Sequence, residues 1–189
     1  MTESRLSTFI NEFRGGNRAH RYEISGSIGG NNDLNKFFVR AVSLPPSQIN
    51  EIRIPYRGRI LKWPGDRVYQ PWTIRILDEN GSNNLWKAFH DWSDDINSHI
   101  ENNNELNVLE DFTKDWIIKQ VDENEDTMKE INLIGCWPNL IGPIDMDANA
   151  VDTLVEFNVV VNYQYYEVTK WIGVYYGIRL IWFYNRKEV

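Results

Sequence analysis

Apolar and polar residues alternate along several segments of the chain, a period-two pattern that is typical of strands with one buried face. In one of them, Trp72, Ile74 and Ile76 alternate with polar or charged residues, and Val68 extends the same face. The segments predicted to form strands are 20–28, 36–44, 67–77, 112–121, 127–136 and 151–166. Because helices do not separate these strands at regular intervals, the pattern disfavours a doubly wound parallel sheet.

The longest alternation predicts that residues 151–166 form a single strand. Its expected inward face consists of Val151, Val155, Phe157, Val159, Val161, Tyr163 and Tyr165. Upstream, the acidic turn 122–126 is expected to join two strands. The prolines of Trp137-Pro138 and Gly142-Pro143 predict a bent loop between 136 and 151.

One segment has the helical period instead. Over residues 83–100 the apolar side chains recur at spacings of three and four, which predicts an amphipathic helix, about 82–100 with its cap. The expected stripe is Leu85, Phe89, Trp92, Ile96 and Ile100. Ser82 is the expected N-cap, and the asparagines at 102–104 are expected to end the helix. A shorter amphipathic helix is predicted over 4–13.

The segment 47–65 has the pattern of a long hairpin that turns at 56–59. Pro55 and Pro64 lack the backbone N–H that a central strand must donate, so this hairpin is not expected inside a sheet. We predict an arm, about 45–67, that projects from the body. Between residues 47 and 65 it carries four cations, Arg53, Arg57, Arg59 and Lys62, and a single acidic residue, Glu51. The predicted fold class is therefore mainly β, with antiparallel sheets forming a β-sandwich or barrel, one flanking α-helix and a long projecting hairpin.

The 189 residues, 42% hydrophobic and 25% charged, suit one globular domain. The net charge of −7 hides an asymmetry. Residues 1–75 carry 12 Lys and Arg against 6 Asp and Glu, a net +6, whereas 76–189 carry 8 against 21, a net −13. This split indicates either charge-complementary contact between copies of the chain or a basic patch for an anionic partner.

No catalytic or metal-binding motif stands out in the sequence. The single cysteine, Cys136, excludes an internal disulfide and is expected to be a buried structural residue. The three histidines, His20, His90 and His99, have no metal-ligand spacing. We expect no catalytic residues, no cofactor and no metal, and the start of the chain has no pattern of a signal peptide.

The basic arm allows two interpretations. Arg57 and Arg59 beside Tyr56 have the composition of a nucleic-acid contact, in which guanidinium groups bind phosphate and an aromatic ring stacks. The sequence pI of about 5.0 argues against it, because the acidic remainder would repel a duplex. We favour a protein–protein role for the arm and keep a nucleic-acid-binding module as the alternative of a different class.

A set of short motifs, in their order and spacing, resembles the major tail tube protein family of contractile-tailed bacteriophages over about residues 13–167. The matching motifs are GGNRAHRY from Gly15, VSLP from Val42, IPYRGR from Ile54, GDR from Gly65, WTI from Trp72, the Trp86, Phe89 and Trp92 helix, IGCWP from Ile134, IGPID from Ile141, and FNV from Phe157 to Tyr163.

The resemblance implies a structural protein and not an enzyme. Family members form hexameric rings that stack into a hollow tube, which the tail sheath protein surrounds and through which phage DNA passes without specific binding. The other implied partners are baseplate and tail-terminator proteins, and the implied location is the virion, after assembly in the host cytoplasm. We also expect an acidic lumen. The arm residues implied at the contact between subunits or rings are Arg53, Tyr56, Arg57, Arg59, Lys62, Trp63, Asp66 and Arg67.

The chain departs from the family pattern at its C-terminal end. After a tail-tube-like domain over 1–167, residues 168–189 add two tryptophans and four further aromatic residues. This extension could be an extra core strand, a contact for the sheath or an unusual terminus. Two related interpretations therefore stay open. The chain is either a tube-initiating paralogue at the baseplate or the tube protein of a phage-like injection or secretion system.

Overall fold

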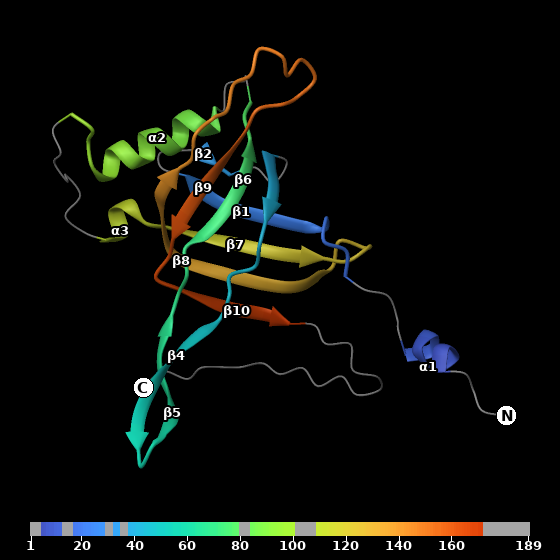
Figure 1. Cartoon of the computed structure of the whole chain (residues 1–189). Helices are drawn as coiled ribbons and strands as arrows, with labels where there is room; N and C mark the ends of the chain where they lie inside the picture. Colours follow the sequence, from blue (N-terminus) through green and yellow to red (C-terminus); the bar gives the residue numbers. More distant parts are fainter. Residues whose placement is uncertain are drawn as a thin grey trace, which may run out of the picture.

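Two groups of antiparallel strands cross each other to form the body of the protein (Figure 1). The computed structural model describes residues 5–12, 17–28, 32–34, 38–79, 84–100 and 109–171. The strands are β1 Tyr22–Ile28, β2 Asn32–Asp33, β3 Val39–Val42, β4 Gln48–Tyr56, β5 Arg59–Val68, β6 Trp72–Leu77, β7 Lys114–Val121, β8 Thr127–Ile141, β9 Glu156–Asn162 and β10 Tyr165–Trp171. The helices are α1 Arg5–Glu12, α2 Leu85–Ile96 and α3 Leu109–Phe112.

The described strands outside the β4–β5 pair form one eight-stranded sheet in the order β2-β1-β7-β8-β9-β6-β3, and β10 pairs with β8 beside this path. The first part of β8 pairs with β7 and β10, and its last part pairs with β9. β8 therefore belongs to both layers of the body. One layer also contains β2, β1, β7 and β10, and the other contains β9, β6 and β3. All pairings are antiparallel, which confirms the predicted mainly β fold of antiparallel sheets.

The bend in β8 centres on Gly135, whose φ of +67° is a conformation that glycine adopts without strain. Its N–H donates to Asp115 Oδ1 at 2.9 Å, and the N–H of Gln164 donates to the carbonyl of Ile134 at 2.9 Å. The predicted bent loop at Trp137-Pro138 is wrong, because β8 continues to Ile141. Pro138 pairs with Val161 next to a register shift between Pro138 and Leu140, and such irregularities are places where a strand tolerates proline.

The prediction of one strand over 151–166 is also wrong. The structure has two strands, β9 and β10, that pair with opposite parts of β8, so the chain must cross from one layer to the other between them. The alternation changes phase at this crossing: Tyr163 is buried, whereas Tyr165 is exposed and Tyr166 half-buried. Val151, expected on the inward face, lies in a loop and is 86% exposed.

Aromatic side chains fill the space between the two layers. Trp116 of β7 meets Trp72 of β6 edge-on, with ring centroids 5.9 Å apart, and α2 adds Phe89 and Trp92 at 6.3 and 6.2 Å from the Trp116 ring. The indole N–H of Trp116 donates to the carbonyl of Ser27 at 2.9 Å, so the buried ring leaves no donor unpaired. These contacts explain why α2 covers one end of the body (Figure 1).

Helix α2 is shorter than predicted. Asn84 caps it by accepting from the N–H of Lys87 at 2.8 Å, and the predicted cap, Ser82, lies outside the described residues. The helix ends at Ile96, before the predicted asparagines, so Ile100 is not part of its stripe and is 94% exposed. The short helix α3, which follows the segment 101–108, was not predicted.

The two ends of the chain are described only in part. The predicted helix over 4–13 is present as α1, with Leu6, Phe9 and Ile10 exposed. β10 extends to Trp171, so the expected domain boundary at 167 falls inside this strand. Most of the aromatic extension, 172–189, lies outside the described residues. Of the helices in the described ranges, none combines the length and apolar character needed to cross a bilayer.

Candidate self-assembly interface

A two-stranded hairpin projects from the body at the end opposite α2 (Figure 1). It consists of β4 and β5, pairs from Gln48 opposite Val68 to Tyr56 opposite Arg59, and forms a sheet of its own. We call residues 48–68 the arm. Every residue from 48 to 64 is exposed, so the arm contributes nothing to the core of this subunit.

The arm has two chemically different faces. Residues directly opposite in an antiparallel pair share a face, as do residues two apart along a strand. The pairs Ile52–Trp63, Ile54–Leu61 and Tyr56–Arg59 therefore lie on one side. We call this side the apolar face; its members are Ile52, Ile54, Tyr56, Arg59, Leu61 and Trp63.

The apolar face has no cover within the described chain. Ile52 is 52% exposed and Trp63 is 59% exposed, and the other apolar members of the face are exposed to a similar extent. A contiguous row of large apolar side chains is unusual on the surface of a soluble monomer, and marks a contact surface. The arm thus has an apolar face of the kind that strands normally bury, but no described residue covers it.

The opposite face carries an internal charge network. Glu51 accepts from Lys62 Nζ at 3.0 Å and from Arg53 Nη2 at 2.5 Å. These hydrogen bonds, first from Lys62 and then from Arg53, lower the pKa of the Glu51 carboxyl below its ordinary value of 4.5. Arg53 and Lys62 therefore already share an acidic partner within the arm.

The tip of the arm presents two further cations, Arg57 and Arg59. Arg57 and Gly58 both have positive φ, +44° and +76°, as a two-residue turn of type I′ requires. The guanidinium of Arg57 lies 5.3 Å from the centre of the Tyr56 ring. Neither Arg57 nor Arg59 makes an ion pair with any described residue, so both charges are available to a partner.

The predicted site residues all lie on or at the base of this hairpin, but they do not form one cluster. Tyr56, Arg59 and Trp63 share the apolar face, whereas Arg53 and Lys62 face the other way. Arg67 Nη1 donates to Ser47 Oγ at 2.6 Å at the base, and Asp66 is exposed beside it. The sequence interpretation missed Ile52, Ile54 and Leu61. Their period-two spacing with Tyr56 and Trp63 was the signal that could have found them.

The other candidate chemistry in the sequence does not form a site. Cys136 is fully buried, and burial raises the pKa of its thiol to about 12, which keeps it protonated and unreactive. Across the part of the chain that the structure describes, no group of three or more His, Cys, Asp and Glu side chains could hold a metal ion.

Known proteins that resemble this chain include tail tube proteins of phages. No family model matches the chain. It is 28% identical over 169 residues to the tail tube protein of Serratia phage KSP90, covering 82% of this chain and 93% of that protein. It is 24% identical over 132 residues to tail tube protein gp19 of Enterobacteria phage T4, covering 69% and 80%.

Two solved structures share its fold. A chain of the anti-feeding prophage baseplate superimposes with a TM-score of 0.57 at 13% identity, over 82% of this chain and 95% of that one. A chain of the sheath–tube complex of an extracellular contractile injection system, PVC, gives 0.50 at 19% identity, over 88% and 99%. The resemblance carried by the sequence motifs is thus confirmed: the curated relatives that this chain matches are tail tube proteins of contractile-tailed bacteriophages.

Proposed function

We propose that this chain is the structural subunit of a phage tail tube, in which hexameric rings stack into a hollow conduit for the genome. The observation that carries the proposal is the arm, whose row of large apolar side chains is not covered by any described part of its own subunit. A second copy is the occupant that the homologues suggest. The role is mechanical: subunits transmit the push of sheath contraction, and no step needs a catalytic group.

Ring closure has a physical basis in the sheet. Among the described strands, β3 pairs only with β6, and β10 pairs only with β8, so each leaves one backbone edge unpaired. Exposed edges invite pairing with other chains, and a closed ring of subunits removes them. We propose that these edges meet in the ring and that the arm acts between rings, with Arg53, Tyr56, Arg57, Arg59, Lys62, Trp63, Asp66 and Arg67 at or near the contact.

The proposed partners follow the same assembly. They are the sheath protein around the tube, baseplate and terminator proteins at its ends, and phage DNA that passes through without specific binding. The net charge of −7 supports this last point, because binding to DNA depends mainly on phosphate contacts with basic residues. The proposed location is the tail of the virion. A tube-initiating paralogue is the second candidate, favoured by the shared fold with a baseplate chain.

Electron microscopy of two proteins tests this function. The first is the full chain, and the second has residues 49–67 replaced by a short turn that joins Gln48 to Val68. Because no core residue belongs to that segment, the shortened chain is expected to fold. We expect tubes with a central channel from the full chain, and separate rings or monomers from the shortened one. Rings that never stack at high concentration would favour the baseplate paralogue, and salt-sensitive DNA binding by a monomer would favour the nucleic-acid-binding module.

A further inference from the structure

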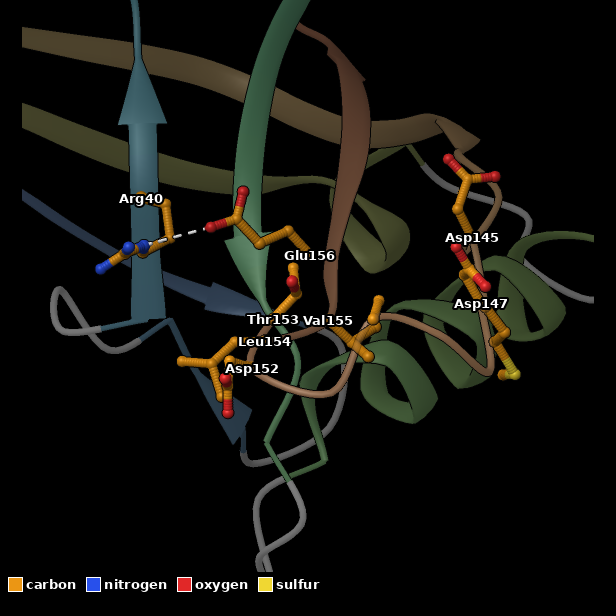
Figure 2. A pocket seen from close by; sticks show the side chains of 10 residues that line it. Arg40, Asp145, Asp147, Asp152, Thr153, Leu154, Val155 and Glu156 are labelled. Carbon is orange, nitrogen blue, oxygen red and sulfur yellow. Dashed lines mark hydrogen bonds and ion pairs between the residues drawn. The ribbon is translucent and has the colours of Figure 1, made fainter.

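The end of the body opposite the arm carries a loop with the complementary chemistry. Residues 142–155, which we call the end loop, connect β8 to β9 and lie beside α2 in Figure 1, far from the arm. The loop borders an open hollow of about 760 Å³ (Figure 2). The side chains that the argument uses are Asp145, Met146, Asp147, Asp152, Leu154 and Glu156.

The hollow keeps an excess of negative charge. Glu156 is matched by Arg40, at 3.2 Å, and lies 3.9 Å from Arg75. Asp147 accepts hydrogen bonds within the loop from Asn149. Asp145 and Asp152 make no ion pair with any described residue, and Figure 2 shows them on different sides of the hollow. Three carboxylates of the hollow, Asp145, Asp147 and Asp152, therefore lack a cationic partner among the described residues, against the two unpaired guanidinium groups at the tip of the arm.

The end loop also exposes large apolar side chains. Met146 is 87% exposed, Val151 is 86% exposed and Leu154 is 68% exposed. Charge alone would make the hollow an ordinary acidic surface. Acidic and apolar side chains together match the arm, whose tip and apolar face present arginine beside tyrosine, isoleucine and tryptophan.

We propose that the end loop of one subunit receives the arm tip of another copy of this chain, with Arg57 and Arg59 pairing with Asp145 and Asp152. This inference rests on the proposed function and names the surface that the arm binds. The donor and the acceptor lie at opposite ends of the subunit, so each copy uses one to bind above and the other to bind below. A head-to-tail contact of this kind does not close on itself and generates stacks of indefinite length.

The turn at the tip supports a binding role for Arg57. A two-residue turn of this type favours Asn-Gly, because residues other than glycine, asparagine and aspartate are strained at positive φ. Arginine at that position makes the turn less favourable. It also adds a positive charge that forms no ion pair with any described residue of its own chain. A substitution at Arg57 can therefore separate folding of the arm from its binding.

Charge reversal tests the contact in the full chain. One variant carries Arg57→Glu and Arg59→Glu, a second carries Asp145→Lys and Asp152→Lys, and a third carries all four. The readout is the protein concentration at half-maximal tube formation, from sedimentation and electron microscopy at fixed salt. We expect each double variant to raise that concentration about tenfold or more, because a weak contact is repeated around every ring, and the combined variant to recover most of the loss.

Two further variants keep the test sharp. Glu110→Lys with Asp111→Lys, on exposed positions of α3, makes the same change of charge elsewhere and is expected to leave tube formation unchanged. Arg57→Asn removes one charge but suits the turn, so its melting temperature should not fall while its stacking weakens.

The outcomes separate this inference from the function it rests on. If the full chain forms tubes, the arm-shortened chain does not, and the reversed charges change nothing or fail to rescue one another, the docking proposal is wrong and the tube function stands. If the α3 control weakens stacking as much as the end-loop variant does, the effect is one of net charge and the proposal is again wrong. If the full chain never stacks, both proposals fail.

Discussion

Strand β6 and the arm use the same kinds of residue with opposite results. In β6, Trp72, Ile74 and Ile76 are at most 1% exposed. This strand pairs with β3 and β9, and its Trp72 contacts Trp116 of β7 in the other layer. In the arm, Ile52, Ile54 and Trp63 alternate in the same way and are about half exposed. The comparison teaches that period-two alternation reports a face that will be buried, but not whether the covering layer belongs to the same chain.

The largest difference between the two regions is expected when one tryptophan is removed from each, Trp116 from the core and Trp63 from the arm. Trp116→Ala should lower the free energy of unfolding by about 3–5 kcal/mol, because it removes a fully buried ring and leaves a cavity between the layers. Urea unfolding followed by circular dichroism measures this loss. A change below about 1 kcal/mol would mean that the layers collapse onto the vacated space, and that the core is less specific than its ring contacts indicate.

A smaller effect is expected from adding a methyl group beside the same ring. A Cβ on Gly26 would lie 2.2 Å from Trp116 Cδ1, so Gly26→Ala forces the indole to move and should cost about 1–3 kcal/mol. The matched change in the arm is Gly58→Ala, where no atom lies within 4 Å and only the positive φ opposes the substitution. Thermal melts of both variants should show a clearly lower midpoint for the core change alone.

The two regions should also respond at opposite ends of the pH scale. Burial raises the pKa of Cys136 from 9.0 to about 12 and that of Tyr163 from 10.0 to about 12. The folded state therefore holds these protons more tightly, and the stability they contribute is present below about pH 9 and is lost as pH rises toward 12. Glu51 has a lowered pKa, so the contribution of its ion pairs is lost on acidification instead.

Unfolding curves between pH 7 and 11 test the alkaline end. The free energy of unfolding should fall steadily above about pH 9, and the fall should be shallower in a Cys136→Ala variant. A parallel decline in both proteins would assign the effect to other groups. The native thiol should also resist a thiol reagent at pH 8 until denaturant is added.

The smallest expected change in stability belongs to the arm. Trp63→Ala should alter the free energy of unfolding by no more than about 0.5 kcal/mol, because the ring is 59% exposed and does not belong to the hydrophobic core. The same variant should stack poorly, since an exposed tryptophan is the kind of anchor that dominates interfaces. A substantial loss of monomer stability would show that the arm folds back on the body in solution.

The sequence was sufficient where pattern and packing coincide. The alternation around Ile74 identified an inward face correctly, and the spacing of Leu85, Phe89 and Trp92 identified the face of α2 that meets the core. The failures fall where tertiary geometry replaces local preference. Pro138 predicted a loop, whereas the structure has it in β8 next to a register shift. That shift depends on the pairing of β8 with β9, and the local sequence does not reveal this pairing.

The candidate site was predictable in charge but not in shape. The cations of the arm could be counted from the sequence, and their excess over Glu51 was evident. Which of them stay free depends on register: Arg53 lies opposite Lys62, so both reach Glu51, while Arg57 and Arg59 at the turn do not. The sequence predicted a strand where the end loop lies, because Val151 and Val155 have the same period as β9. The strand itself begins only at Glu156.

The pairing of β1 with β7 has a consequence for how each subunit is made. The carbonyl of Ser27 and the indole of Trp116 that bonds to it are 89 residues apart in the chain. At a synthesis rate of about 5–20 residues per second, β1 leaves the ribosome roughly 4 to 18 seconds before β7 does. Contacts so distant in sequence also form slowly. Until β7 is made, β1 therefore has only the two-residue strand β2 as a pairing partner, and the body closes late in the synthesis of its own chain.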